Sequence, residues 1–253
     1  MSGHSKWHEI KRKKAAKDVQ KGRIFSRCAR EIMVAAREGG GNPDNNPRLR
    51  LAIQNARDAG MPGDNIIRAI KKGTGELEGE QLERQTYEGY GPYGVALLID
   101  TLTDNRNRTV AELRRILSRA GGSMGEAGCV AWMFHPKGVI HIPRNGLDED
   151  TVLEIVLEAG AEDMSISDDS FEIITAPEDY ENVRQALEEG GISLSSAEIT
   201  MLPQTTIQLT EEQQARQILR LMDALEDQED VQRIYANFDI PEDLMRRIEE
   251  ETE

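Results

Sequence analysis

The chain has 253 residues, of which 38% are apolar and 30% are charged, and its formal net charge at pH 7 is −15. Because no apolar run approaches the roughly 20 residues that cross a bilayer, and no secretory signal segment is recognisable, a membrane or secreted protein is not expected. The two cysteines stand in neither a metal-binding nor a redox spacing. We therefore expect a cytoplasmic protein of two or three domains.

Charge is distributed unevenly along the chain. Residues 1–75 hold 17 Lys and Arg but only 7 Asp and Glu, a net charge of +10. The rest of the chain holds 14 Lys and Arg against 39 Asp and Glu, a net charge of −25. A basic segment joined to an acidic body is typical of proteins that bind a polyanion such as nucleic acid.

Residues 1–75 carry only helical signals. A lysine-rich stretch covers 5–20, and apolar residues recur at helical spacing over 23–38 until a run of glycines ends the helix. Asn46 is expected to cap the next helix, with Pro47 at its first position. A short last helix is expected to end at Gly73. We therefore predict a basic helical bundle over residues 1–75.

After a connector rich in Gly and Glu, strands alternate with helices. Residues 136–203 show the order βαββαβ, which is the ferredoxin-like pattern. The predicted strands are 138–142, 164–167, 171–175 and 197–202, and the predicted helices are 149–158 and 178–189.

Each flank of this unit supplies a strand, a helix and a strand. The predicted ranges are 95–101, 110–120 and 130–135 before the unit, and 206–209, 211–225 and 231–237 after it, with an extra strand near 86–90. We predict an α+β fold: an N-terminal basic helical bundle followed by two ferredoxin-like α/β domains, one inserted in the other. The discontinuous domain covers 84–135 plus 204–238, the inserted domain covers 136–203, and residues 239–253 form an acidic C-terminal tail. A linear order of domains is the alternative.

The basic residues near the N-terminus are the strongest functional signal. On a helix, Lys14, Lys17 and Lys21 share one face, and several cations that meet a phosphate backbone together release its condensed counterions. The alternative is a solvated helix face. The predicted nucleic-acid-binding residues are Lys6, Lys11, Arg12, Lys13, Lys14, Lys17, Lys21, Arg23, Arg27 and Arg30.

Two loops add further candidates. Residues 89–94 match G-x-G-x-x-G, but a strand follows where a dinucleotide site needs a helix, so a turn between two strands is preferred. Tyr90 and Tyr93 in this turn either stack on bases or simply pack over the turn. In the loop 103–109, Arg106 and Arg108 are possible nucleic-acid contacts, although Asn107 or Thr109 as a helix cap explains part of that loop structurally.

Signals for catalysis are weak. The four histidines form no metal-type cluster, and no hydrolase, P-loop or zinc-protease motif occurs. The carboxylates are scattered along helix faces. We therefore predict no catalytic residue, no metal, no cofactor and no small-molecule substrate.

Six motifs in order resemble one family. They are Gly-His-Ser-Lys-Trp at 3–7, Arg-Glu-Gly-Gly at 37–40, Asn-Pro-Arg-Leu-Arg at 46–50, Met-Pro-Gly-Asp-Asn-Ile at 61–66, Tyr-Glu-Gly-Tyr-Gly-Pro at 87–92 and Thr-Asp-Asn-Arg-Asn-Arg-Thr at 103–109. Together they resemble the YebC/PmpR family, which includes the mitochondrial translational activator of cytochrome c oxidase. The resemblance reaches to near residue 240. It implies a helical bundle, two α/β domains with one inserted in the other, and a non-enzymatic role in gene expression.

The resemblance implies two alternative functions. Some members of the family are described as DNA-binding transcriptional regulators, and others act at the ribosome, where they help translation through proline-rich stretches. Family naming favours a transcriptional regulator with DNA as its partner. Repulsion between extended duplex DNA and the −25 body favours a ribosome-associated factor that contacts rRNA or tRNA. A third possibility is a scaffold whose acidic domains bind a basic protein.

Overall fold

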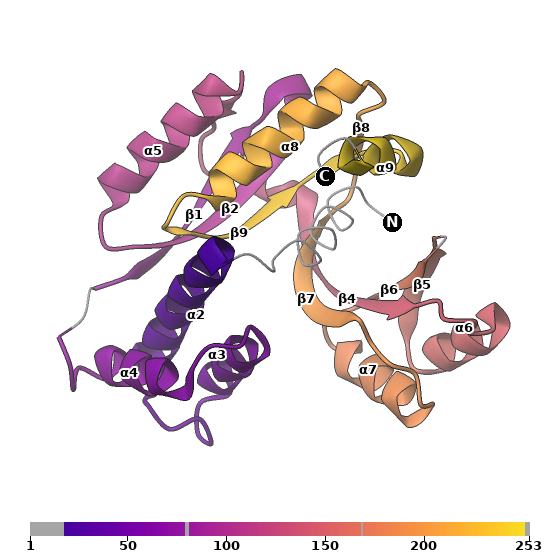
Figure 1. Ribbon diagram of the computed structural model, residues 1–253, viewed down its shortest axis with the longest axis horizontal. Coiled ribbons are helices and arrows are strands. Elements are labelled where there is room, and N and C mark those ends of the chain that lie inside the picture. Colours follow the sequence, from indigo (N-terminus) through magenta and orange to yellow (C-terminus); the bar gives the residue numbers. More distant parts are fainter. Residues whose placement is uncertain (1–17, 79–80, 168, 251–253) are drawn as a thin grey trace.

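The computed structural model describes residues 18–78, 81–167 and 169–250, in which α-helices pack on mainly antiparallel sheets. This confirms the predicted α+β class. Three groups of elements form three lobes (Figure 1): helices α2 to α4, a first sheet with α5 and α8, and a second sheet with α6 and α7. No helix among the described residues is both long and apolar enough to cross a membrane.

The first lobe is a bundle of α2 (Asp18–Gly39), α3 (Pro47–Asp58) and α4 (Gly63–Gly73). Asn46 caps α3 as predicted, since its Oδ1 accepts from the Leu49 amide at 3.0 Å. Its Nδ2 donates to the carbonyls of Ala35 and Gly40, at 2.8 and 2.9 Å. One buried side chain therefore joins the end of α2 to the start of α3.

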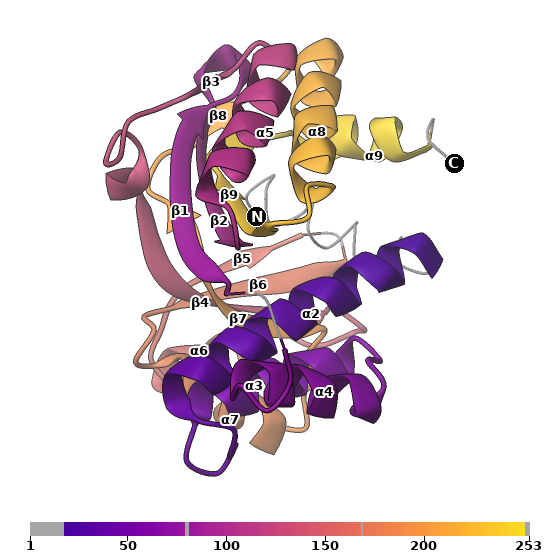
Figure 2. The ribbon, with the colours of Figure 1, turned by 90° about the vertical axis from the view of Figure 1, so that its left-hand side faces the viewer.

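The first sheet has the strand order β3-β1-β2-β9, and its pairs are antiparallel. Its strands are β1 (Glu83–Tyr90), β2 (Ala96–Thr103), β3 (Ser123–Met124) and β9 (Val231–Ala236). A short turn, η1 (Pro92–Gly94), joins β1 to β2, which confirms the turn predicted for 89–94. Helices α5 (Arg106–Arg119) and α8 (Glu212–Glu226) lie side by side on one face of this sheet (Figure 2), and Leu113 and Leu221 are among the residues they bury against it.

The second sheet has the order β5-β6-β4-β7, and all its pairs are antiparallel. Its elements follow the predicted chain order βαββαβ: β4 (Phe134–Pro143), α6 (Glu149–Glu158), β5 (Ala161–Ile166), β6 (Ser170–Thr175), α7 (Tyr180–Glu189) and β7 (Ser196–Pro203). The two helices share a core with the sheet that includes Phe171, Ile173 and Val183.

The first sheet differs from the expected second ferredoxin-like arrangement. Residues 131–133 form a 3-10 helix, η2 (Ala131–Met133), and the strand predicted at 130–135 begins only at Phe134, in the second sheet. In place of the strand predicted at 206–209, the structure has the two-residue strand β8 (Ile207–Gln208). It lies outside the first sheet and pairs in parallel with β10 (Phe238–Asp239). In the sheet, β2 lies between β1 and β9. β1 pairs with β2 because a hairpin closed by a short turn pairs eight residues at a low cost in loop entropy.

The acidic C-terminal segment also differs from the expected tail. Residues 242–250 form helix α9 (Glu242–Glu250), whose Leu244, Met245 and Ile248 are buried in the core of the first sheet with α8. These three residues share one face of the helix, so the acidic side chains around them hide an amphipathic pattern.

Candidate nucleic-acid interface

Two of the predicted nucleic-acid-binding arginines on α2 contact residues 226–230, the last residue of α8 and the loop that joins it to β9, which we call the acidic loop. The start of α2 lies next to this loop (Figure 1). Arg23 forms an ion pair with the carboxylate of Asp227. Arg27 donates a hydrogen bond to the backbone carbonyl of Glu226. Burial lowers the pKa of Arg27, and the two acidic neighbours oppose that shift.

Arg30 reaches the same loop through a more buried contact. Its Nη1 lies 2.9 Å from Oδ1 of Asp230, and it also donates to the carbonyls of Glu229 and Leu102, at 3.0 and 3.2 Å. The side chains of Arg30 and Asp230 are only 12% and 1% exposed. The structure thus brings Arg23, Arg27 and Arg30 together, but onto the chain's own acidic loop.

Asp230 is the centre of this contact. Besides Arg30, its carboxylate accepts from Thr109 at 2.8 Å, from Gln228 at 3.2 Å and from Arg108 at 3.4 Å. Burial by itself would raise the pKa of Asp230, but the hydrogen bonds from Thr109, Arg30 and Gln228 outweigh it and hold the pKa below its ordinary value. The carboxylate is therefore ionised at neutral pH and joins α2, α5 and the acidic loop.

The two arginines of the 103–109 loop lie in the first turn of α5. The cap is Asn105, whose Oδ1 accepts from the Arg108 amide at 3.1 Å, and not Asn107 or Thr109 as expected. Arg106 pairs with Glu83 at 2.6 Å, and Arg108 pairs with Asp104 at 2.6 Å. The side chains of Arg106 and Arg108 are 60% and 49% exposed.

The two tyrosines of the β1–β2 turn are exposed, but their hydroxyl groups are bound. Tyr93 Oη donates to Gln217 Oε1 at 2.7 Å, and Tyr90 Oη donates to the Cys129 carbonyl at 3.2 Å. Tyr93 has a backbone φ of 64°, which lies in the left-handed region that residues other than Gly rarely adopt. Trp132, which is 65% exposed, donates to the same Cys129 carbonyl at 3.2 Å.

A buried carboxylate fixes the glycine-rich stretch between α5 and β4. Glu88 accepts hydrogen bonds from the amides of Gly128, Val130 and Ala131 at 2.6 to 2.8 Å. Burial would raise the pKa of Glu88, but these amides outweigh it and the pKa is lowered. Glu88 thus ties the C-terminal end of this stretch to β1. Trp132, which follows directly, has an exposed side chain.

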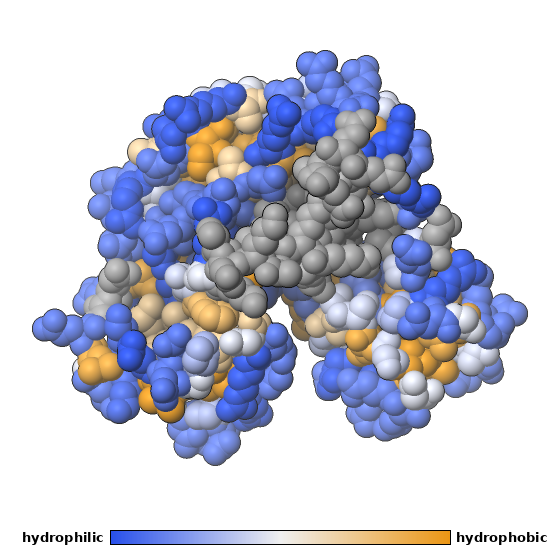
Figure 3. All heavy atoms as spheres, viewed as in Figure 1, coloured by the Kyte–Doolittle hydropathy of each residue, from blue (hydrophilic) through white to orange (hydrophobic). Residues whose placement is uncertain are grey.

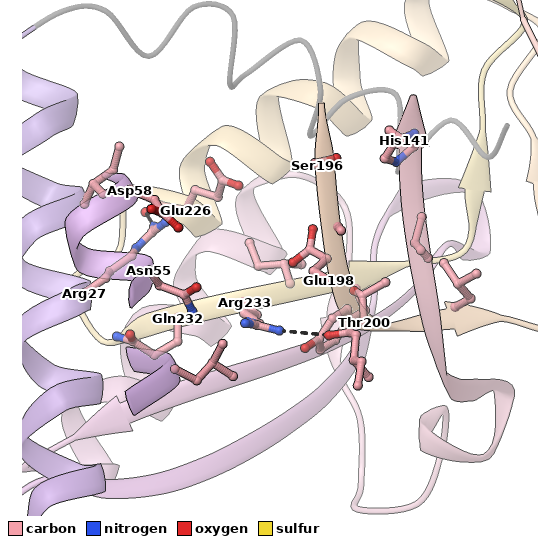
Figure 4. A pocket seen from close by; sticks show the side chains of 18 of the residues that line it. Arg27, Asn55, Asp58, His141, Ser196, Glu198, Thr200, Glu226, Gln232 and Arg233 are labelled. Carbon is pink, nitrogen blue, oxygen red and sulfur yellow. Dashed lines mark hydrogen bonds between the residues drawn. The ribbon is translucent and has the colours of Figure 1, made fainter. Parts of the chain in front are cut away.

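A hollow of about 810 Å³ is lined by residues of α2 and α3 on one side and of β7 and β9 on the other. On the surface, a notch separates the lobe of α2 to α4 from the lobe of the second sheet (Figure 3). Figure 4 shows its charged lining: Arg27 and Arg233 face a region shared with Asp58, Glu198 and Glu226. Arg233 donates to the Ile199 carbonyl at 3.4 Å. Because the lining of this hollow contains carboxylates as well as cations, its charge does not suit a polyanion.

Several predicted residues lie outside this description. Lys6, Lys11, Arg12, Lys13, Lys14 and Lys17 fall in residues 1–17, which the structure does not describe, and the side chain of Lys21 is likewise not described. Within the described ranges, no group of three His, Cys, Asp or Glu side chains could hold a metal ion.

Two family models match the chain: "TACO1/YebC protein N-terminal domain" over residues 5–76 and "TACO1/YebC second and third domain" over residues 82–238. The chain belongs to the TACO1/YebC family. The resemblance stated from six sequence motifs is thereby confirmed, and the N-terminal model covers nearly all of the basic segment.

Relatives within the TACO1/YebC family match over nearly their full length. One from Syntrophobacter fumaroxidans is 56% identical over 98% of this chain and all of its own, and one from Halothermothrix orenii is 53% identical over 99% and 100%. Each bears the name "Probable transcriptional regulatory protein". A conserved hypothetical protein from Aquifex aeolicus, known from its crystal structure, is 48% identical in sequence to this chain. Its structure matches with a TM-score of 0.77, and the match covers 89% of this chain and 93% of that one.

Sequence reasoning missed a set of arginines on the first sheet's helices. Arg108, Arg115 and Arg119 stand seven and four residues apart on α5, a spacing that places them on one helix face. Together with Arg220 of α8, they line a groove between the two helices. The spacing was readable from the sequence, but only Arg108 was singled out, because the surrounding 178 residues have a large negative net charge.

Proposed function

We propose that this protein is a non-enzymatic, nucleic-acid-binding regulator of gene expression that acts in transcription, in the cytoplasm, with DNA as its partner. The observation that carries the proposal is the net charge of +10 on residues 1–75 in a chain that is otherwise strongly acidic. The names of the full-length relatives, which are 53% and 56% identical, support a role in transcription.

The lysine-rich segment supplies most of the phosphate contacts in this proposal. Arg23, Arg27 and Arg30 are already bound by the acidic loop, so they contribute only where α2 parts from that loop. The segment includes Lys6, Lys11, Arg12, Lys13, Lys14, Lys17 and Lys21. Phosphate contacts orient a protein on nucleic acid, and base contacts elsewhere must supply any sequence preference.

The three lobes divide this work in the proposal. Residues 1–75 act as the basic domain, 84–135 plus 204–238 as a discontinuous α/β domain, and 136–203 as a domain inserted into it. The separate cores of the two sheets support this division, and the core of the helical bundle also takes in Leu82 and Leu102.

A salt titration of the full chain on duplex DNA tests the proposal. Five or more phosphate contacts give a slope of log affinity against log salt steeper than about −4. K13E/K14E should lower affinity by at least about tenfold. The matched control is R144E/R247E, which makes the same charge change on exposed residues of the other lobes. A flat salt response, or equal losses in the two variants, would refute the proposal.

Crosslinking in living cells tests the role in transcription. Ultraviolet crosslinks enriched at a few promoters, with ribosomal RNA at background, support it. Crosslinks concentrated in large-subunit rRNA near the peptidyl-transferase region would replace it with the alternative, a ribosome-associated translation factor that assists synthesis of proline-rich stretches.

A further inference from the structure

A groove of about 770 Å³ runs between α5 and α8. The two helices lie next to each other on the first sheet (Figure 2), with their apolar faces, including Leu117 and Leu225, buried in a common core. Above this core, Ile116, Ala120 and Leu221 line the floor of the groove. Its cationic lining comes from both helices.

The cations are arranged along the groove. Arg108, Arg115 and Arg119 follow one face of α5 at spacings of seven and four residues, and Arg220 contributes from α8. The two helices run antiparallel, because Arg108 of α5 approaches Asp230 just after α8, while Ala120 after α5 contacts Gln217 near the middle of α8.

The charge of the groove changes from one end to the other. At the end near Arg108, the lining includes Asp227 and Glu229 of the acidic loop. One turn after Arg108 on α5, the carboxylate of Glu112 is bound to Arg115 at 2.7 Å. Arg119 and Arg220 are exposed, and neither forms a hydrogen bond or ion pair with another described residue. The end of the groove that holds these two arginines therefore has a surplus of positive charge.

An exposed aromatic ring is fixed at the same end. Gln217, which lines the groove, accepts from Tyr93 Oη at 2.7 Å and donates to the Ala120 carbonyl at 2.8 Å. This amide thereby ties the β1–β2 turn to both helices. The Tyr93 side chain is 43% exposed, so a ring face is available beside the free cations.

We propose that the groove between α5 and α8 binds a single-stranded nucleic acid. Arg115, Arg119 and Arg220 contact consecutive phosphates, and Tyr93 stacks on a base at the end of the groove. Guanidinium groups suit phosphate oxygens because they donate in a planar fork, and aromatic rings accept any base by stacking. The ring and the three cations together match a strand whose phosphates and bases are both accessible.

The exposed ring of Tyr93 favours a single strand over a duplex. In a duplex the bases are stacked inside, where Tyr93 has no access to their faces. Ribose and deoxyribose strands share the chemistry that this site recognises.

The residues that line the groove of this site belong to α5, α8 and the acidic loop, and none of them is among residues 1–75. Its ligand class rests on the proposed function, but its location does not. A protein that lacks the groove contacts would still bind duplex DNA through residues 1–75, so the two proposals fail separately.

Fluorescence anisotropy of the full chain with a labelled 15-nucleotide RNA, the same sequence as single-stranded DNA, and a duplex DNA tests the site. R119E/R220E should weaken binding of both single strands by about tenfold and make the log–log salt slope about 1.4 shallower, since two contacts are lost. R144E/R247E, the control with an equal charge change, should leave all three affinities within about twofold. Y93A should cost about tenfold on the single strands, and Y93F, which keeps the ring but loses the bond to Gln217, should cost less than Y93A.

Circular dichroism melts of each variant establish that it folds, and R119Q/R220Q replaces the reversal variant if that one does not. Unchanged single-strand affinity in the folded arginine variant would overturn the proposal, as would a loss confined to duplex DNA. If the wild type binds no nucleic acid at all, the proposed function falls together with this site. If K13E/K14E loses duplex binding while R119E/R220E binds single strands normally, only this site falls.

Discussion

Two sets of arginines in this protein differ in what surrounds them. Those of α2 stand in the most basic part of the sequence, and three of them, Arg23, Arg27 and Arg30, contact the chain's own acidic loop. Arg119 and Arg220 stand in an acidic part of the sequence, yet they are exposed and form no hydrogen bond or ion pair with another described residue. Local charge density along a chain therefore does not tell which cations are available to a ligand, because the folded neighbours decide it.

The largest expected effect comes from removing the buried carboxylate of the acidic loop. D230A should lower the free energy of unfolding by about 3 kcal/mol, because it leaves the nearly buried Arg30 without its charged partner. D227A breaks only the half-exposed pair with Arg23 and should cost less than about 1 kcal/mol. Urea denaturation of both variants measures the difference, and equal losses would show that the α2 contact is not centred on Asp230.

Acid should remove the same stabilisation. The pKa of Asp230 in the folded protein is below its ordinary value, so the carboxylate stabilises the fold above the unfolded pKa of about 3.9, and the contribution is lost as pH falls through the folded pKa. The difference in unfolding free energy between wild type and D230N should be constant from pH 7 to 5 and shrink below pH 4. A difference that stays constant down to pH 3 would contradict the lowered pKa.

The carboxylate of Glu88 should have the next largest effect. E88Q keeps the shape of the side chain but replaces one of the two accepting oxygens with an NH₂ group, which cannot accept from the backbone N–H groups. We expect a loss of about 2 kcal/mol in the free energy of unfolding. E126Q, an exposed change nearby, is the control. Fluorescence of Trp132 in a W7F background reports whether the stretch loosens, and an unchanged spectrum with unchanged stability would contradict an anchoring role.

The groove arginines should give the smallest effect on stability. R119Q/R220Q should change the free energy of unfolding by less than about 0.5 kcal/mol, because these exposed side chains have no partner among the described residues. R30Q, by contrast, should destabilise by more than about 1 kcal/mol, since it breaks a buried charged contact. Equal stability losses in the two variants would remove the distinction between bound and available arginines.

Much of the local structure was predictable from the sequence. The spacing of apolar residues and the Asn46-Pro47 cap predicted α3, and similar spacing predicted α2 and α4. The order of strands and helices from β4 to β7 followed from alternating patterns bounded by turn residues. The amphipathic face of α9 was less visible, because three apolar residues are spread among acidic ones.

The candidate site was less predictable than the fold. The sequence pointed to Arg23, Arg27 and Arg30 by their density, and it pointed to Tyr93 by its place in a glycine-rich turn. It contained no sign that Asp230, some 200 residues from Arg30, would neutralise that arginine. Nor did it indicate that Gln217 would hold Tyr93 beside the arginines of α5 and α8.

The sequence by itself determined the family, the α+β class, most helices and the segregation of charge, because periodicity, caps and composition act over a few neighbouring residues or add up along the chain. Only the tertiary structure decided which strand lies beside β2 and which arginines are paired. Strand pairing and ion pairing join residues far apart in the chain. Their partners are fixed by packing of the whole domain, which no local pattern specifies.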